Sequence, residues 1–228
     1  MSIILQIETA TTVCSVALAK NGETMAVKEL NERNIHAEVI TSYIEGLMAG
    51  SGLKYDDIDA IAVSSGPGSY TGLRIGVSTA KGLCFALDKP LIAVETLESM
   101  AQGIISTGSI ADDTLLCPMI DARRMEVYTA LFDAKGNVVK PTSAEIIDEE
   151  SFCGQLQTRK ILFFGDGAEK CRPVLSAGPN ALFDTGFINS ASHLTQKAAE
   201  KYAAGKFEDV AYFEPFYLKD FLVVQKKH

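Results

Sequence analysis

The stretch AVSSGPGSYTGLRIGVSTAKGL, residues 62–83, has the pattern of a strand, a glycine turn and a helix. We interpret the rest of the chain from this stretch. The residues at 58–65 are apolar and bounded by turn residues, which predicts a short buried strand. The glycine-proline-glycine turn at 66–68 ends this strand. We expect Ser69 or Thr71 to cap the helix that follows, because either hydroxyl can accept a hydrogen bond from an unpaired backbone N–H group.

The helix predicted after this turn, at 72–87, has small residues on one face. The positions spaced four residues apart are Gly72, Gly76, Ala80 and Cys84. Because of that spacing they lie along one stripe. Two glycines inside a helix cost on the order of 1 kcal/mol each relative to alanine, so a close neighbouring backbone is expected in compensation. The sequence leaves open whether this neighbour belongs to the same chain, a second copy or a different protein.

The composition is that of an ordinary globular protein. Of the 228 residues, 47% are hydrophobic and 22% are charged, which suits one large domain or two modest ones. The formal net charge of −8 disfavours nucleic-acid binding by this chain alone, since that binding needs Lys and Arg to neutralise phosphates. The five cysteines form no CxxC pair, and no apolar run reaches the roughly 20 residues of a membrane span. We therefore expect a cytoplasmic protein without membrane contact.

The first half of the chain has the pattern of a β-meander followed by helices and strands in alternation. Strands are expected at 3–8, 14–19, 24–28 and 91–94, and a further helix is expected from residue 96. Asn21-Gly22 is a strong hairpin signal, because type I′ turns need positive φ at both central positions. Apolar pairs at helical spacing predict a helix at 36–49. His36 begins this helix, and we expect it to cap the helix or to lie at the surface.

The second half repeats the same plan. Ile7-Glu8 matches Ile120-Asp121 at an offset of 113 residues, close to half the chain, which favours an internal duplication. Residues 161–170 again lead from a strand into a glycine loop and a helix. We expect an N-terminal lobe at 1–106 and a C-terminal lobe at 107–228, with the last segment packing back onto the N-terminal lobe. Its aromatic side chains are expected to dock on a lobe: Phe213, Phe216, Tyr217 and Phe221.

Candidates for ligand binding or catalysis are few. The glycine loop at 66–72 could hold an anion at a helix N-terminus, but it matches neither GxxxxGK[ST] nor GxGxxG, so close packing is preferred. Glu8 and Asp121 end equivalent strands, where a two-lobed phosphotransferase would hold a metal-bound nucleotide, and they are candidates for a vestigial cleft. The alternative function is accordingly an ATP-dependent small-molecule kinase. Arg123-Arg124 either forms ion pairs within its hairpin or faces a partner, and the sequence does not decide between these.

Motifs of other enzyme classes are missing from the sequence. It contains neither HxxxH nor HExxH, and no GxSxG elbow. We therefore assign no catalytic residue and no metal ligand.

The residues SGPGSYTGLRIG at 65–76 closely resemble SGPGSFTGLRIG, the signature of the bacterial TsaB (YeaZ) family, with Tyr70 in place of the usual Phe. Three further blocks resemble the family: ILQIETATTVCSVAL at 4–18, KPLIAVETLESMA at 89–101 and IDARRMEVYTALF at 120–132. The resemblance implies an α/β fold of two lobes, like that of actin, hexokinase and the heat-shock ATPases, built from a duplicated β-meander plus helices. It also implies a role in forming N6-threonylcarbamoyladenosine next to the anticodon of tRNAs that read codons starting with A.

The resemblance further implies a non-catalytic scaffold or activator. TsaB-like chains pair with TsaD, the paralogue that transfers the threonylcarbamoyl group, and the pair recruits the ATPase TsaE. A homodimer is implied when TsaD is absent, and tRNA contact is implied only through the complex. No cofactor is implied for the isolated chain, and ATP would enter through TsaE. TsaD-like enzymes bind a metal through two histidines on an early helix, whereas this chain has His36 followed by Ile40 there, so we expect no metal site.

The family's partner-binding surface consists of two helices of the N-terminal lobe, which match 36–49 and 72–87 here. The expected interface residues are Ile40, Tyr43, Ile44, Leu47, Gly72, Leu73, Arg74, Ile75, Gly76, Thr79, Ala80 and Leu83. The small-residue stripe would then find its close neighbour across a subunit interface. On this basis we expect Gly76→Arg or Ala80→Glu to leave the monomer folded but to abolish binding to TsaD.

Overall fold

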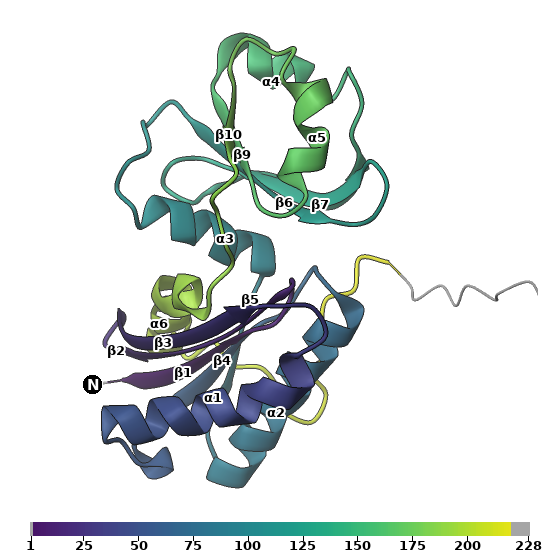
Figure 1. The fold of residues 1–228 in the computed structure, drawn as a ribbon. Coiled ribbons are helices and arrows are strands. Elements are labelled where there is room, and N and C mark those ends of the chain that lie inside the picture. The colour runs from purple at the N-terminus through teal and green to yellow at the C-terminus, as the bar shows by residue number, and fades with distance from the viewer. Residues whose placement is uncertain (1, 220–228) are drawn as a thin grey trace, which may run out of the picture.

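Two five-stranded sheets, each carrying helices, lie one above the other in the computed structural model, which describes residues 2–219 (Figure 1). The strand orders are β3-β2-β1-β4-β5 and β10-β9-β6-β7-β8. In each sheet the central strand, β1 or β6, pairs antiparallel with the strand that follows it and parallel with a later strand, β4 or β9. The second sheet therefore has the connectivity of the first, which confirms the internal duplication.

The N-terminal lobe contains the predicted meander. Its elements are β1 (Ile3–Glu8), β2 (Val13–Lys20), β3 (Glu23–Asn31), α1 (His36–Ser51), η1 (Tyr55–Asp57), β4 (Ala60–Ser64), α2 (Tyr70–Leu87), β5 (Leu91–Val94) and α3 (Thr96–Ile105). Asn21 and Gly22 both have positive φ, 52° and 81°, as the predicted hairpin turn requires. Ser69 caps α2, since its hydroxyl accepts the Gly72 N–H at 3.2 Å. Strand β3 is longer than predicted, because it pairs along the whole of β2.

The C-terminal lobe repeats the meander of the N-terminal lobe, but the helices that follow the meander are shorter than those of the N-terminal lobe. It contains β6 (Leu115–Asp121), β7 (Glu126–Phe132), β8 (Val138–Ile146), α4 (Cys153–Thr158), β9 (Ile161–Phe164), α5 (Ala168–Leu175) and β10 (Ala181–Asp184). The elements β8, α4 and β10 have no counterpart among the predicted ones. Strand β8 lies at the sheet edge, with Val138 and Ile146 exposed and Pro141 inside it, so it lacks the alternating pattern of a half-buried strand.

After β10 the chain returns to the N-terminal lobe through η2 (Ala191–Leu194) and α6 (Thr195–Ala203). Leu194 and Ala198 are buried in a cluster with residues of β1, β4 and β5. The Thr195 hydroxyl donates to the Gln6 side chain at 2.9 Å. The first sheet is therefore covered by α1 and α2 on one face and by α6 on the other (Figure 1). Among residues 2–219, no helix is both long enough and apolar enough to cross a membrane.

The C-terminal segment, defined here as residues 206–219, lies along the edge of β5 and beside α2. The Glu208 N–H donates to the Leu91 carbonyl at 2.9 Å, which forms an isolated antiparallel bridge. The Lys81 ammonium of α2 donates to the Ala211 and Phe213 carbonyls at 3.2 and 2.9 Å. Phe213 also packs against the core of the N-terminal lobe, as predicted for this aromatic residue.

The same segment then crosses the start of α2. The Phe216 N–H donates to the Ser65 carbonyl at 2.7 Å, although Phe216 as a whole is 41% exposed. The Tyr217 ring lies 4.9 Å from the Tyr70 ring, so this side chain docks on the N-terminal lobe. The predicted docking of Phe221 lies outside the described residues.

Candidate functional site

The small-residue stripe of α2 faces the interior of its own lobe. A Cβ added at Gly72 would lie 2.1 Å from the Thr9 carbonyl oxygen, and one added at Gly76 would lie 2.1 Å from the Thr9 hydroxyl. That hydroxyl donates to the Gly72 carbonyl at 2.8 Å. Ala80 and Cys84 on the same stripe are also buried. The close neighbour that compensates for the two glycines is therefore the β1–β2 loop of the same chain.

This burial corrects much of the expected partner interface. Seven of the twelve expected residues are buried in the protein's own lobe: Ile40, Ile44, Leu47, Gly72, Leu73, Gly76 and Ala80. The apolar spacing of a helix identifies the face that packs on the sheet, so these buried residues are not available to a partner. The expectation that Gly76→Arg or Ala80→Glu leaves the monomer folded is corrected for the same reason, since both would insert a charged side chain into the core.

The outward faces of α1 and α2 consist mainly of small and polar side chains. Of the expected interface residues, Arg74 is exposed, and four are half-buried: Tyr43, Ile75, Thr79 and Leu83. Exposed residues that were not expected include Thr41, Ser42, Gly46, Ala49, Gly50, Ser78, Gly82 and Phe85. A Cβ added at Gly50 or Gly82 would meet nothing within 4 Å, and the Phe85 side chain is 86% exposed. Sequence reasoning missed this face because small polar residues carry no hydrophobic signal.

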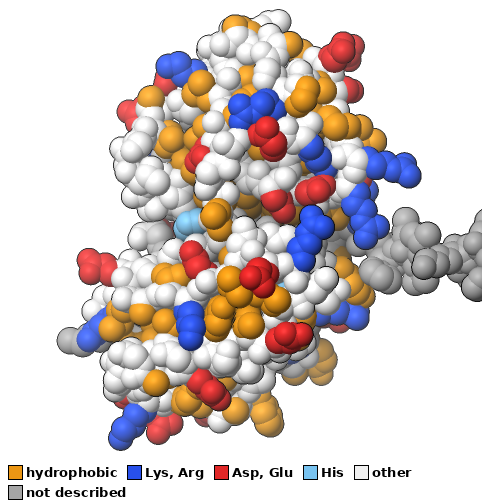
Figure 2. Space-filling view, viewed as in Figure 1, with side chains coloured by type: hydrophobic (Ala, Val, Ile, Leu, Met, Phe, Trp, Pro, Cys, Tyr) orange, Lys and Arg blue, Asp and Glu red, His pale blue; other side chains and the backbone are white. Residues whose placement is uncertain are grey.

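The two helices lie side by side on the outer side of the N-terminal lobe (Figure 1). Hydrophobic side chains gather on the visible face of this lobe in Figure 2. We define the exposed residues of α1 and α2 named in the preceding paragraph as the outer helix face. Because most of its side chains are short, with Arg74 and Phe85 as the long ones, another helix could approach it closely.

The C-terminal segment borders the outer helix face at the start of α2. The Arg74 guanidinium lies over the Tyr70 ring, 4.3 Å from its centroid. A hydrogen bond with Tyr217 raises the pKa of Arg74, and Tyr70 and Glu214 add smaller effects in the same direction. Of the expected interface residues, Arg74 is therefore already engaged within the chain.

The glycine loop at the start of α2 is packed by the chain itself. A Cβ added at Gly66 would lie 2.5 Å from the Phe216 carbonyl oxygen, and one added at Gly68 would lie 2.4 Å from the Ala10 carbonyl oxygen. The Ser69 N–H donates to the same Ala10 carbonyl at 2.7 Å. These contacts support the interpretation of the loop as a tight structural turn in preference to an anion site.

Glu8 and Asp121, expected together in a vestigial cleft, have different environments. Glu8 is fully buried, and its Oε1 accepts the Ala10 N–H at 2.6 Å and the Ser64 hydroxyl at 3.0 Å. Burial raises the pKa of Glu8 to about 7. Asp121 is exposed at the end of β6, and its Oδ1 accepts a hydrogen bond from the Lys170 Nζ at 2.5 Å. The expectation is therefore corrected for Glu8, which does not face the space between the lobes.

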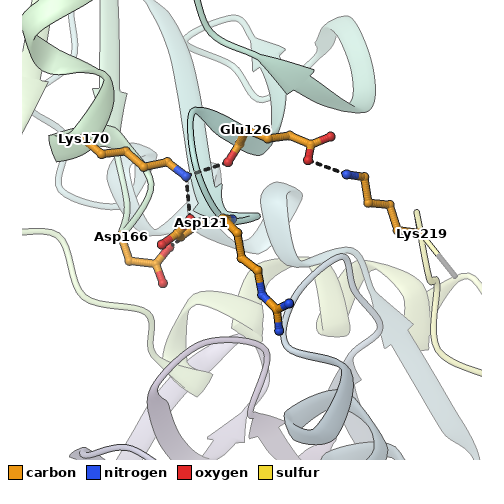
Figure 3. Close-up of polar contacts among 6 residues, drawn as sticks. Asp121, Glu126, Asp166, Lys170 and Lys219 are labelled. Atoms are coloured by element: carbon orange, nitrogen blue, oxygen red, sulfur yellow. Dashed lines mark hydrogen bonds and ion pairs between the residues drawn. The ribbon is translucent and has the colours of Figure 1, made fainter. Parts of the chain in front are cut away.

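A hollow of about 340 Å³ lies between the lobes. It is lined by Thr12, Asn31, Glu32, Arg33, Asp121 and Asp166. Figure 3 shows the residues on its C-terminal side, where the Lys170 ammonium lies between the Asp121 carboxylate and the Glu126 carbonyl. Lys219 of the C-terminal segment pairs with the Glu126 carboxylate, so this segment contacts both lobes. Among residues 2–219, no group of three or more His, Cys, Asp and Glu side chains could hold a metal ion.

His36 is buried, which corrects the expectation that it caps α1 or lies at the surface. Its Nε2 lies 3.0 Å from the Thr11 carbonyl oxygen and 3.1 Å from the Val13 carbonyl oxygen. The imidazole therefore fixes the start of α1 to the end of the β1–β2 loop. This loop, through Thr9 and Thr11, contacts both helices of the N-terminal lobe.

Comparison with known proteins identifies what the chain resembles. The family model for TsaD, tRNA N6-adenosine threonylcarbamoyltransferase, matches residues 28–220. The tRNA threonylcarbamoyladenosine biosynthesis protein TsaB of Escherichia coli K12 is 34% identical over 229 residues, which cover 95% of this chain and 94% of that protein. The solved structure of YeaZ from Pseudomonas aeruginosa is 26% identical and has a TM-score of 0.78, covering 96% of this chain and all of the other.

A more distant structure resembles the fold alone. The activator of the 2-hydroxyisocaproyl-CoA dehydratase from Clostridium difficile, solved with ADPNP, has a TM-score of 0.52 at 10% identity, covering 91% of this chain and 98% of the other. Together with the family model and the YeaZ structure, it confirms the two-lobed fold that the sequence predicted.

Proposed function

The chain belongs to the TsaB family of tRNA threonylcarbamoyladenosine biosynthesis proteins, and on this premise we propose that it is a non-catalytic subunit that binds a TsaD-type threonylcarbamoyltransferase. Its role in the biosynthesis of threonylcarbamoyladenosine in tRNA follows from the family. The proposal adds that the chain acts as a scaffold or activator through the outer helix face. The paired complex then recruits the ATPase TsaE, and ATP enters the reaction there and not through this chain.

The observation that carries the proposal is the exposure of the outer helix face. Gly50 and Gly82 leave open space where a side chain would be, and Ser42, Gly46 and Ser78 are exposed beside them on the same two helices. Exposed glycines inside a helix cost about 1 kcal/mol each relative to alanine, and the described part of the chain, residues 2–219, offers no contact that compensates for Gly50 or Gly82. Close approach of a partner's helix would supply that contact. In the absence of TsaD, a second copy of this chain could occupy the same face, which gives the homodimer.

The alternative, a small-molecule kinase, is less well supported by the residues between the lobes. Glu8 is buried against Ala10 and Ser64 and cannot reach a nucleotide in the hollow. Asp121 is paired with Lys170. Neither carboxylate is free to orient a metal-bound phosphate, which a phosphoryl transfer requires.

The proposal is tested with two matched variants. Gly82→Arg places a long charged side chain on the outer helix face, whereas Gly154→Arg places it on α4 of the C-terminal lobe, and a Cβ at either position meets nothing within 4 Å. Both variants should therefore fold. The chain is mixed with TsaD from the same source, and complex formation is measured by size-exclusion chromatography with light scattering.

We expect the wild type and Gly154→Arg to form the complex and Gly82→Arg to remain free. Formation of threonylcarbamoyladenosine on tRNA, assayed with TsaD and TsaE present, should follow the same order. Normal assembly by Gly82→Arg would exclude the outer helix face as the binding surface. ATP hydrolysis or phosphorylation of a metabolite by the chain alone would favour the kinase.

A further inference from the structure

The hairpin between β6 and β7 has two consecutive arginines in a backbone conformation that arginine rarely adopts. Arg123 and Arg124 have φ of 74° and 49°, in the left-handed region. Each such residue other than glycine costs on the order of 1 kcal/mol. The hairpin at Asn21-Gly22 solves the same geometric problem with residues that tolerate positive φ. Turn geometry therefore does not explain the choice of arginine at this hairpin.

Both arginine side chains are exposed. The Asp121 carboxylate accepts the backbone N–H of Arg123 at 2.8 Å, which holds the turn in place. Within residues 2–219, neither the Arg123 nor the Arg124 guanidinium has a hydrogen-bond or ion-pair partner. The nearby carboxylates are instead paired with lysines, Asp121 with Lys170 and Glu126 with Lys219 (Figure 3). The sequence left open whether these arginines form ion pairs within the hairpin or face a partner. Within the described residues they form no ion pair in the hairpin.

The duplicated half of the molecule offers an internal comparison. At the offset of 113 residues, Arg123 and Arg124 correspond to Ala10 and Thr11 in the β1–β2 loop. Ala10 and Thr11 are buried under the helices, where the loop supports α1 and α2. In the C-terminal loop Met125 packs against the core of its lobe, whereas Arg123 and Arg124 are exposed and present their two positive charges to solvent.

Further positive charge lies around the junction of the lobes. Arg33 lines the same hollow as Asp121 but from the N-terminal lobe, and it is exposed. Figure 2 shows Lys and Arg side chains at the lobe junction on the right of the visible face, with Asp and Glu side chains among them. The hollow itself also contains Glu32 and Asp166, which would repel a small anion inside it. The arrangement therefore suits an extended polyanion that crosses the rim better than a phosphate held within the hollow.

We infer that Arg123 and Arg124 contact the phosphate backbone of the tRNA when this chain is part of the modification complex. The inference rests on the proposed function, which places the chain beside a bound tRNA. Arginine presents several N–H donors in a plane that match phosphate oxygens. With a net charge of −8 the chain does not hold RNA by itself, so its arginines add to binding that the complex provides.

The test uses a double variant that removes both charges without weakening the turn. Arg123→Asn with Arg124→Gly installs the residues that form the turn at Asn21-Gly22, so thermal unfolding should occur at an unchanged or higher temperature. The control, Lys20→Ala with Lys160→Ala, also removes two charges. Lys20 pairs with the first residue of β1, and Lys160 precedes β9, so both lie at the ends of the sheets away from the hairpin.

Affinity of fluorescent tRNA for the assembled complex is measured at several salt concentrations. Loss of two phosphate contacts should make the slope of log K against log salt less steep by about 1.4 to 1.8, which at 100 mM salt is a roughly 25- to 60-fold loss of affinity. The control variant should keep the wild-type slope. Light scattering should show that all three complexes assemble.

An unchanged slope in the double variant would overturn the inference while leaving the proposed function intact. An equal change in the control would also overturn it, because the effect would then reflect net charge alone. If the double variant fails to assemble in a salt-dependent way, the arginines face an acidic surface of a protein partner and not RNA. If the wild-type chain itself forms no complex, the proposed function fails first.

Discussion

Replacing Gly76 by alanine should destabilise the protein, although the same change in most helices is stabilising. The new methyl group would lie 2.1 Å from the Thr9 hydroxyl, whereas real Cβ atoms essentially never approach a neighbour closer than 3.0 Å. Thr9 is fully buried, and its hydroxyl already donates to the Gly72 carbonyl. The loop or the helix must therefore shift by close to 1 Å, and that hydrogen bond is strained or lost.

The magnitude follows from three contributions. Overpacking a close-packed core costs about 1 to 3 kcal/mol. Loss of a buried hydrogen bond costs about 1 kcal/mol, and the better helix propensity of alanine returns about 1 kcal/mol. We expect Gly76→Ala to lower the free energy of unfolding by about 1 to 3 kcal/mol.

Gly82→Ala provides the control in the same helix. Gly82 is exposed and a Cβ there meets nothing, so the variant should gain about 1 kcal/mol from helix propensity alone. Urea denaturation of the three proteins, at a concentration where each is monomeric, measures both changes. A Gly76→Ala protein as stable as Gly82→Ala would refute the conclusion that the small-residue stripe packs on the β1–β2 loop.

Three further changes should alter stability or local exchange. Because burial raises the pKa of Glu8 from 4.5 to about 7, its stabilising effect is complete below about pH 4.5 and is lost as the pH rises through 7. As the pH rises from 4.5 to 8, the free energy of unfolding of Glu8→Gln should therefore increase relative to that of the wild type by up to about 3 kcal/mol in denaturation experiments. A difference that does not change with pH would contradict this. Lys81→Met removes the donor to the Ala211 and Phe213 carbonyls, so amide hydrogen exchange should accelerate in 206–219 and not in the sheet; unaltered exchange there would argue against the contact. His36→Ala removes the imidazole from the Thr11 and Val13 carbonyls and should lower the free energy of unfolding by about 1 to 3 kcal/mol in urea denaturation. A neutral effect would place His36 outside the packing of α1.

Sequence reasoning predicted the parts of the fold that depend on local signals. The turn at Asn21-Gly22, the cap at Ser69 and the strand at 91–94 are all observed. The offset that joins Ile7-Glu8 to Ile120-Asp121 also predicted the shared connectivity of the two sheets. These signals are strong because backbone geometry restricts which residues can occupy such turns, and because a duplicated chain repeats its pattern.

The neighbour against which the small-residue stripe packs could not be predicted in this way. Gly72 and Gly76 show that something approaches α2 closely, but an approaching loop and an approaching helix require the same small residues. Only the position of Thr9 in three dimensions shows that the neighbour is the β1–β2 loop. The outer helix face was missed for a related reason, since residues such as Ser78 and Gly82 give no hydrophobic signal.

The environment of Glu8 was likewise hidden in the sequence. Its place at the end of β1 matches that of Asp121 at the end of β6, yet Glu8 is fully buried, whereas Asp121 is exposed and pairs with Lys170 of α5. Duplicated positions keep their backbone geometry while their burial changes with what packs on them. The role of a residue in one half therefore cannot be assigned to the matching residue of the other half from the sequence alone, because it also depends on the three-dimensional contacts.

Hydrogen exchange of this chain, alone and bound to TsaD from the same source, would show whether the outer helix face is the binding surface. Mass spectrometry would report the exchange of each segment in the two states. We expect exchange to slow in α1 and α2, the helices that carry the outer helix face. Slowing confined to the C-terminal lobe, with α1 and α2 unchanged, would contradict it.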